Sequence, residues 1–272
     1  MIGKHQRFRM AGFRYAGDMV EHAQGHGNQE DHAPGYNSGS GTSVSTGETL
    51  AQRERSELAG LLEQVGPDEP TLCEGWRTRD LAAHLVVREH KPWAAAGMFI
   101  PQLEDTLDKA MDDVRAQDYL QVCEKFRKGA PAWSPFSWAD KLANTAENFI
   151  HHEDVRRGGG GEVQPRQFSM SDSRELWNIA RRMSKVLLRP TKTRLIFNWK
   201  AKNGEEHRLI DSFTVQPQPG RTPNNGHDVP LGVISGEPGE VLLWVFGRDK
   251  AADLTIEWLG QGAQEGVRRN SI

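Results

Sequence analysis

The sequence has few cysteines and no long apolar run. Cys73 and Cys123 are the two cysteines among 272 residues, too few for a disulfide framework. No stretch approaches the ~20 consecutive apolar residues that a membrane-spanning helix needs, and the N-terminus has no apolar segment of the signal-peptide kind. We therefore expect a soluble protein of the reducing cytoplasm with no membrane partner.

An excess of charge of one sign is also missing. The chain has 34 Lys and Arg residues against 37 Asp and Glu residues, a formal net charge of -3. This balance gives no electrostatic reason to bind nucleic acid or an anionic membrane. We expect small-molecule partners, for a chain that acts as a monomer or homodimer.

The composition divides the chain into three parts. Residues 1–47 are rich in Gly, Ser, His, Asn and Gln and offer little to fill a core, so they are expected to form a disordered tail. The tail contains four histidines whose irregular spacing argues against a metal site there: His5, His22, His26 and His32. Residues 48–189 show helical periodicity, and residues 190–272 alternate like strands. The predicted fold is a helical bundle followed by a small α+β domain.

Proline and glycine breaks separate the predicted helices. The helices are expected near residues 48–65, 78–98, 102–128, 138–157 and 171–189, with N-caps at Thr78, Ser137 and Ser171. Helices of this length joined by short loops make a bundle. Strands are expected near residues 194–199, 213–215, 229–234 and 254–258. Residues 238–248 read as a short buried helix opened by Pro and Gly, with a strand as the alternative.

One histidine lies on the inward face of the second predicted helix. A projection at ~100° per residue places His84 between Leu81 and Val87 on the apolar side. A single inward histidine is more often a core residue hydrogen-bonded to a carbonyl than a ligand. His84 alone therefore does not define a site.

The helix near 138–157 carries a carboxylate and a histidine four residues apart. Glu147 and His151 stack on one face, at the edge of an apolar arc. The same projection turns His152 toward solvent, so His151 is the expected ligand of the adjacent pair. Glu153 projects into the apolar arc, where its partner is not evident from the sequence.

The combination of the two helices predicts a metal site. Burying an ionised carboxylate beside imidazoles is costly unless a cation compensates, and a divalent ion does so while using the imidazole lone pairs. Two nitrogens and one oxygen from His84, Glu147 and His151 suit Zn²⁺, and also iron, cobalt or nickel. Three protein ligands leave one position open, as catalytic sites do.

These residues also carry a family resemblance. The segments from Thr71 to Trp76 (TLCEGW) and from Thr78 to Leu85 (TRDLAAHL), with the later run from Glu147, resemble the N-terminal domain of the mycothiol-dependent maleylpyruvate isomerases. That domain belongs to the DinB-like four-helix bundles. The resemblance spans about residues 48–190, and the HHEDVRR run that starts at His151 is similar to an actinobacterial branch of this metal-binding family.

The resemblance implies a ligand set and a second domain. In the family, the histidine of the first signature and the glutamate and histidine of the second bind the metal, which implies His84, Glu147 and His151 here. Family members also carry a small C-terminal domain of sterol-carrier-like fold, which residues 234–248 resemble. The implied activity is that of an isomerase or S-transferase that uses mycothiol as cosubstrate.

A mechanism follows from that resemblance. A metal-bound thiol loses its proton at neutral pH, and its thiolate attacks a small electrophilic substrate. Arg88, Arg156 and Arg248 are candidates for positioning an acidic substrate, although a solvated surface charge is the commoner role of an arginine. Asp80 and Asp154, each one turn from a ligand histidine, are candidates to orient it, with a helix cap or an ion pair as the alternative.

Two other functions remain open from the sequence. The chain could be a non-catalytic module that holds a metal and a small ligand for sensing or detoxification, or it could use the metal for hydrolysis. A fourth protein ligand would make the ion structural, whereas an open position would favour catalysis. Cys73 is expected to be a small buried thiol rather than a nucleophile, and Trp76 a packing anchor.

Overall fold

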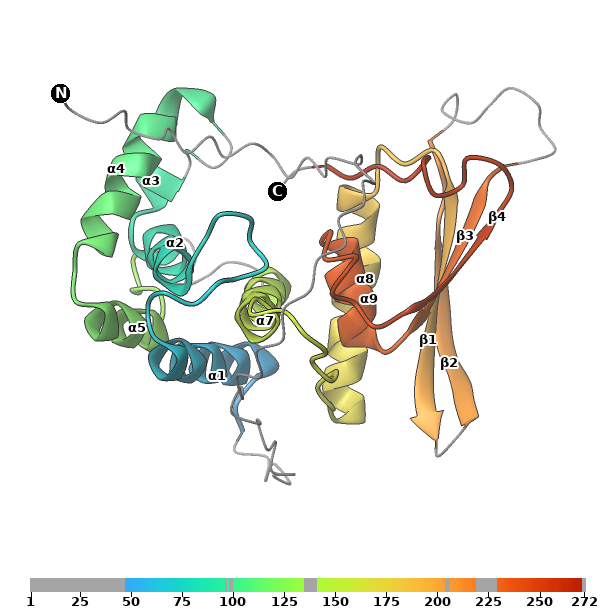
Figure 1. The fold of residues 1–272 in the computed structure, drawn as a ribbon, viewed down its shortest axis with the longest axis horizontal. Coiled ribbons are helices and arrows are strands. Elements are labelled where there is room, and N and C mark those ends of the chain that lie inside the picture. Colours follow the sequence, from blue (N-terminus) through green and yellow to red (C-terminus); the bar gives the residue numbers. More distant parts are fainter. Residues whose placement is uncertain are drawn as a thin grey trace, which may run out of the picture.

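The computed structural model describes residues 47–95, 97, 100–134, 141–203, 206–218 and 229–270. The predicted tail, apart from Gly47, lies outside the described residues, as does the predicted N-cap Ser137. The described part is a mixed α+β structure, with helices first and a four-stranded sheet after them (Figure 1). That order of elements confirms the predicted class, helical first and α+β second.

The helical region begins with a well-capped helix. Helix α1 spans Leu50–Val65, and the Thr49 side chain accepts a hydrogen bond from the Gln52 backbone while the Gln52 side chain accepts one from Thr49. This reciprocal capping pairs two backbone N–H groups that a helix start leaves without partners. The helices that follow are α2 (Thr78–His90), α3 (Pro92–Ala95), the 3₁₀ turn η2 (Pro101–Leu103), α4 (Glu104–Arg115), α5 (Tyr119–Lys128), α7 (Lys141–Arg156) and α8 (Met170–Leu187).

Two predicted helix ranges and two predicted N-caps are wrong. The helix predicted over 102–128 is interrupted after Arg115, because Asp118 begins a new helix by accepting a hydrogen bond from the Gln121 backbone. The helix predicted over 78–98 ends at His90, two residues before a proline. The N-caps are Arg77 and Ser169 rather than Thr78 and Ser171.

The C-terminal region is built on a sheet of order β2-β1-β3-β4. Strands β1 (Arg194–Asn203) and β2 (Glu206–Val215) are antiparallel, β1 and β3 (Leu231–Gly236) are parallel, and β3 and β4 (Thr255–Leu259) are antiparallel. Strand β3 thus pairs with β1 and not with β2, the strand that precedes it in the sequence. Residues 238–245 form helix α9 (Pro238–Val245), so the helical reading of that apolar run is confirmed and the strand alternative is wrong.

Helices α8 and α9 pack on each other and on the same side of the sheet (Figure 1). The shared core contains Trp177 from α8, Trp199 from β1 and Trp244 from α9. Helix α8, which the predicted domain boundary at 189/190 assigns to the bundle, thus buries its apolar face against the sheet domain.

Helix α7 lies between the bundle and the C-terminal core (Figure 1). One of its faces packs along α1, where Asn148 donates to the Ala51 carbonyl and His152 contacts Glu54. Phe149 and Ile150 belong to the core shared with α8 and α9. Because α7 is covered on several sides, His152 is 6 % exposed, and the prediction that it faces solvent is wrong.

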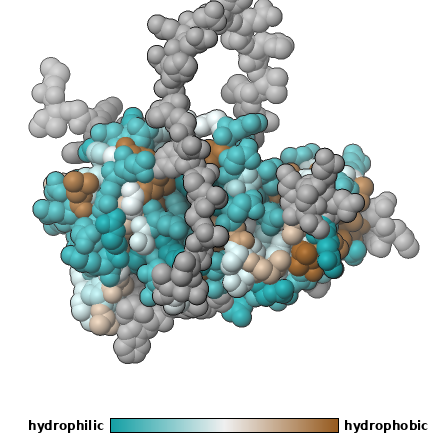
Figure 2. All heavy atoms as spheres, turned by 90° about the horizontal axis from the view of Figure 1, so that it is seen from below, coloured by the Kyte–Doolittle hydropathy of each residue, from teal (hydrophilic) through white to brown (hydrophobic). Residues whose placement is uncertain are grey.

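The surface carries scattered apolar side chains on a mainly hydrophilic background on the face seen in Figure 2. Among the helices of the described chain, none has the length and apolar character needed to cross a membrane.

Candidate metal centre

Helices α2 and α7 bring the three predicted ligands together. His84 comes from the middle of α2, and Glu147 and His151 come from adjacent turns of α7. One ligand atom from each side chain lies within 4.8 Å of the other two. His84 and His151 are 8 % and 9 % exposed, whereas the Glu147 side chain is 21 % exposed, so the imidazoles are shielded from water and the carboxylate is partly accessible.

The distances within this cluster match a coordination sphere better than a hydrogen-bonded cluster. The Nε2 atoms of His84 and His151 lie 3.2 and 3.3 Å from the same oxygen, Oε1 of Glu147. Charge-assisted N–H···O bonds are shorter, about 2.7–2.9 Å. A tetrahedron with zinc–nitrogen and zinc–oxygen bonds has edges of about 3.3–3.5 Å. Each histidine nitrogen therefore lies from the carboxylate oxygen at about the separation of two ligands of one ion.

Asp154 orients the second histidine. Its Oδ2 atom lies 2.9 Å from Nδ1 of His151, which leaves Nε2 of that ring turned toward Glu147. A carboxylate on the far nitrogen is the usual arrangement behind a metal-binding histidine, because it fixes the ring and its tautomer. The prediction that Asp154 orients His151 fits this contact.

Asp154 is itself held by the C-terminal region. Arg248 donates from Nε and Nη2 to the two carboxylate oxygens at 2.9 and 2.7 Å, and the Cys73 thiol donates to Oδ2 at 3.2 Å. Burial raises the pKa of Asp154, but Arg248 and His151 outweigh it and hold that pKa well below its usual range. The carboxylate that orients His151 is thus ionised and tied to both parts of the chain.

A metal ion would compete with a proton at this cluster. Burial raises the pKa of Glu147, yet Arg88 and the two histidines hold it well below its usual value, so this carboxylate is ionised. Burial lowers the pKa of His84, which keeps that imidazole neutral. Burial also opposes a charge on His151, but Asp154 and Glu147 raise its pKa well above the usual value. An ion that binds Nε2 of His151 must therefore displace a proton.

The three predicted substrate-positioning arginines have different places. Arg88 lies at the cluster, with Nε 3.5 Å from Oε1 of Glu147. Arg248 reaches the cluster from behind, through Asp154. Arg156 is directed elsewhere, to Glu153 and the Gln164 carbonyl. Arg88 and Arg248 thus lie near the cluster, whereas the contacts of Arg156 are made elsewhere.

Asp80 does not contact His84. Its carboxylate accepts a hydrogen bond from the Arg77 backbone at 2.9 Å and pairs with Arg115, so it caps α2, the alternative role.

The Nδ1 atom of His84 is buried and has no hydrogen-bond partner among the described residues. The ring of Trp76 lies against that imidazole, with 5.2 Å between centroids. Trp76 therefore packs on a candidate ligand.

Cys73 is buried, as predicted, but its proximity to the site could not be inferred from helical phase. It lies in the loop before α2, and its sulfur groups with His151 and Asp154 within 4.8 Å. Burial and Asp154 raise the pKa of the Cys73 thiol, which argues against a thiolate nucleophile. The sulfur contacts Oδ2 of Asp154, the same oxygen that lies 2.9 Å from Nδ1 of His151. In the part of the chain that the structure describes, no fourth His, Cys, Asp or Glu joins the cluster of three.

The neighbouring charged residues of α7 form a separate network. Glu153, whose partner the sequence did not reveal, pairs with Arg156, Arg157 and Arg166. Arg166 also pairs with Glu54, the partner of His152. A guanidinium thus already supplies the positive charge in the group of Glu54, Glu57 and His152, which the structure also brings together.

Fold and site together define a helical bundle joined to a small sheet domain, with a candidate mononuclear metal centre between α2 and α7. Comparison with known proteins adds no relative to this description. No protein-family model, no curated protein and no solved structure matches the chain.

The two aspartates near the ligand histidines are expected to differ when mutated. Asp154→Asn removes the charge behind His151 and should weaken zinc binding by roughly 10- to 100-fold. Asp80→Asn changes a helix cap only and should leave zinc affinity unchanged. Competition titrations with a zinc-sensitive dye measure both variants. Equal affinity of the wild type and Asp154→Asn would show that Asp154 does not act on the ligand.

Proposed function

We propose that His84, Glu147 and His151 bind one divalent metal ion, best matched by Zn²⁺, and that the protein is a metal-dependent enzyme. The observation that carries the proposal is that two imidazole Nε2 atoms lie 3.2 and 3.3 Å from one carboxylate oxygen. The donor set of two nitrogens and one oxygen is that of catalytic zinc sites, which leave the fourth position to water or substrate.

The chemistry proposed at this site is activation of a thiol. When bound, the ion would lower the pKa of a coordinated sulfhydryl group so that thiolate is available at neutral pH. Asp154 keeps Nε2 of His151 directed into the site. The positive charge of Arg88, beside Glu147, attracts the acidic group of a substrate. The burial of both histidines limits competition from water.

The thiol and the reaction type come from the resemblance of the two signature segments. Mycothiol is the proposed cosubstrate, a small electrophilic compound with an acidic group the proposed substrate, and isomerisation or S-transfer the proposed reaction. The arrangement of a helical bundle before a small α+β region supports this proposal, and so does the presence of both signatures at one cluster.

A turnover assay tests the thiol mechanism. Protein purified without a histidine tag is analysed for metal and then assayed with unsaturated keto acids and other small electrophiles. Turnover should require both zinc and mycothiol, and should fall by more than about 100-fold when either is removed, because a free thiol is only a few per cent thiolate at neutral pH. Restoring zinc after chelation should restore the rate.

Other outcomes distinguish the alternatives. If the protein hydrolyses a substrate with the metal but without any effect of the thiol, the metal activates water rather than a thiol. Binding of metal and thiol without turnover of any electrophile would favour the sensing module. Turnover that persists after removal of the metal would contradict the proposal as a whole.

A further inference from the structure

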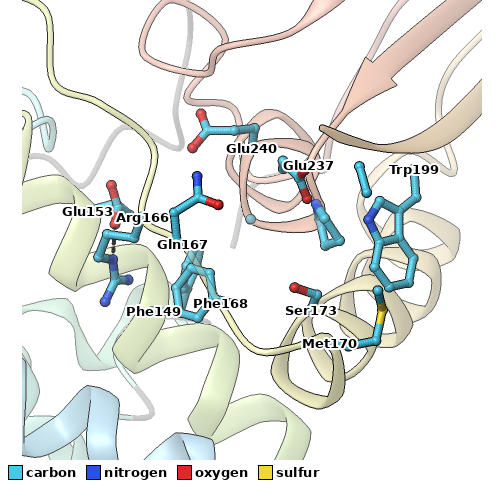
Figure 3. Close-up of a pocket in the computed structure, with 13 residues that line it drawn as sticks. Phe149, Glu153, Arg166, Gln167, Phe168, Met170, Ser173, Trp199, Glu237 and Glu240 are labelled. Atoms are coloured by element: carbon cyan, nitrogen blue, oxygen red, sulfur yellow. Dashed lines mark hydrogen bonds and ion pairs between the residues drawn. The ribbon is translucent and has the colours of Figure 1, made fainter. Parts of the chain in front are cut away.

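A second cavity lies on the other side of α7 from the metal cluster. It has a volume of about 170 Å³ and is bounded by α7, the segment before α8, the first turn of α8, β1 and the start of α9 (Figure 3). His84, Glu147 and His151 are not among its lining residues. What occupies this cavity is therefore a question independent of the metal.

Three aromatic residues are among those that line the cavity. Phe149 and Phe168 contact each other with 5.9 Å between ring centroids, and Trp199 stands across from them (Figure 3). Phe149 and Trp199 are each 1 % exposed, so their positions are fixed by the core behind them. A cavity of about 150 Å³ accommodates benzene. The space here therefore fits one aromatic ring with a small substituent.

The wall also presents a hydrogen-bond donor without a partner. Trp199 is one of the lining residues, and its buried Nε1 atom has no hydrogen-bond partner in the described structure. The neighbouring Trp177, by contrast, donates its Nε1–H to Asp211 at 3.0 Å. Because a buried donor without a partner is costly, an acceptor at this place would be stabilising.

The start of α9 provides further hydrogen-bond donors near the cavity. Pro238, Gly239 and Glu240 line the cavity together with Trp199, and Figure 3 shows the start of α9 beside the indole. The first N–H groups of a helix have no partner within the helix, and the helix dipole places partial positive charge there. An oxygen atom of a ligand would satisfy these donors together with Nε1 of Trp199.

Three of the charged side chains that line the cavity are already paired: Glu153, Arg166 and Glu240. Arg157 donates to Glu240 at 2.7 Å and to Glu153 at 2.6 Å, and Arg166 pairs with Glu153 at 2.5 Å. A charged ligand would have to compete with these contacts or lie beside them without a counterion. The surroundings therefore favour a molecule without net charge.

We propose that this cavity binds a small uncharged molecule consisting of one aromatic ring and an oxygen acceptor, with the oxygen on Nε1 of Trp199 and the ring between Trp199 and the two phenylalanines. The site does not depend on the metal, so it is a second ligand site of the protein rather than a part of the proposed thiol chemistry.

Calorimetric titration with three ring compounds tests the proposal. Benzamide carries a neutral acceptor, benzoate a negative charge and benzylamine a positive charge on nearly the same frame. Benzamide should bind at one saturable site, and the two charged compounds should bind at least about tenfold more weakly. Removing the metal with a chelator should leave benzamide binding unchanged.

Two variants localise the binding. Trp199→Phe keeps a ring but removes the donor, and should weaken benzamide binding by about five- to tenfold. Trp258→Phe, on β4 outside the cavity, is the matched control and should bind benzamide like the wild type. Ala201→Leu places a larger side chain in the cavity wall and should abolish binding, with circular dichroism showing that it folds.

Three results would overturn the proposal. They are the absence of saturable benzamide binding to the wild type, either charged compound as the tightest of the three, and benzamide affinity that neither Trp199→Phe nor Ala201→Leu changes. The first of these would mean that the cavity holds only water.

Discussion

Alanine at His84, Glu147 or His151 is expected to lower zinc affinity by at least about 100-fold, because a site with two protein ligands binds the ion far more weakly than one with three. Each variant should lose nearly all of its metal on dialysis against a weak chelator, whereas the wild type should retain about one equivalent. Elemental analysis measures the metal, and circular dichroism verifies that the helices persist.

Two histidines outside the cluster serve as controls. His90 lies on the same helix as His84 but does not belong to the cluster, so His90→Ala should keep its metal. His152 is adjacent to His151 yet faces Glu54 and Arg166. His152→Ala should lower stability and still keep its metal. Metal retained in all three ligand variants, or lost with His152→Ala but not with His151→Ala, would contradict the assignment.

Replacing Arg157 with Met is expected to destabilise the protein by about 3–5 kcal/mol. The Arg157 guanidinium pairs with Glu153 on its own helix and with Glu240 on α9, and also donates to the Ala251 carbonyl. Glu153 and Glu240 are 1 % and 4 % exposed, and methionine would leave them with less compensation for their buried charge. The pKa of Glu153 is lowered to about 2 despite its burial, through Arg166, Arg156 and Arg157.

An exposed ion pair provides the comparison for Arg157. Arg79 pairs with Asp68 at 2.8 Å, but the two side chains are 44 % and 68 % exposed. Arg79→Met should therefore change the free energy of unfolding by less than about 1 kcal/mol. Urea unfolding followed by circular dichroism measures both variants. Similar small effects of the two substitutions would show that the buried network between α7 and α9 contributes little to stability.

Helical phase was sufficient to predict that His84, Glu147 and His151 lie together. The four-residue spacing of Glu147 and His151 places both on one face of α7, and the apolar flanks of His84 turn it inward on α2. These relations depend only on the local periodicity of a helix. The cluster they predict is the one that the structure brings together.

Contacts between distant segments could not be predicted in this way. Asp154 was recognised as one turn from His151, but its contacts with Cys73 and Arg248 join residues 81 and 94 positions apart. The prediction that His152 faces solvent was wrong because a helical projection identifies only the apolar face of a helix as buried. In the structure α1 covers a further face of α7, where Asn148 and His152 have polar partners.

The same limit applies to the helix ends and to α8. The interruption before α5 depends on the Asp118 cap, and an aspartate within a helical pattern does not by itself mark a break. Helix α8 is amphipathic, and periodicity alone does not say whether its apolar face packs on the bundle or on the sheet. The large apolar side chains of β1 and α9, Trp199 and Trp244 among them, supply that partner.

Anomalous diffraction at the zinc absorption edge tests the central claim most directly. Crystals of the protein grown with one equivalent of zinc should show a single strong peak about 2.0–2.2 Å from Nε2 of His84, Oε1 of Glu147 and Nε2 of His151. The fourth position should hold a ligand that is not a side chain. A peak among Cys73, Asp154 and Nδ1 of His151, or no peak between α2 and α7, would contradict the account.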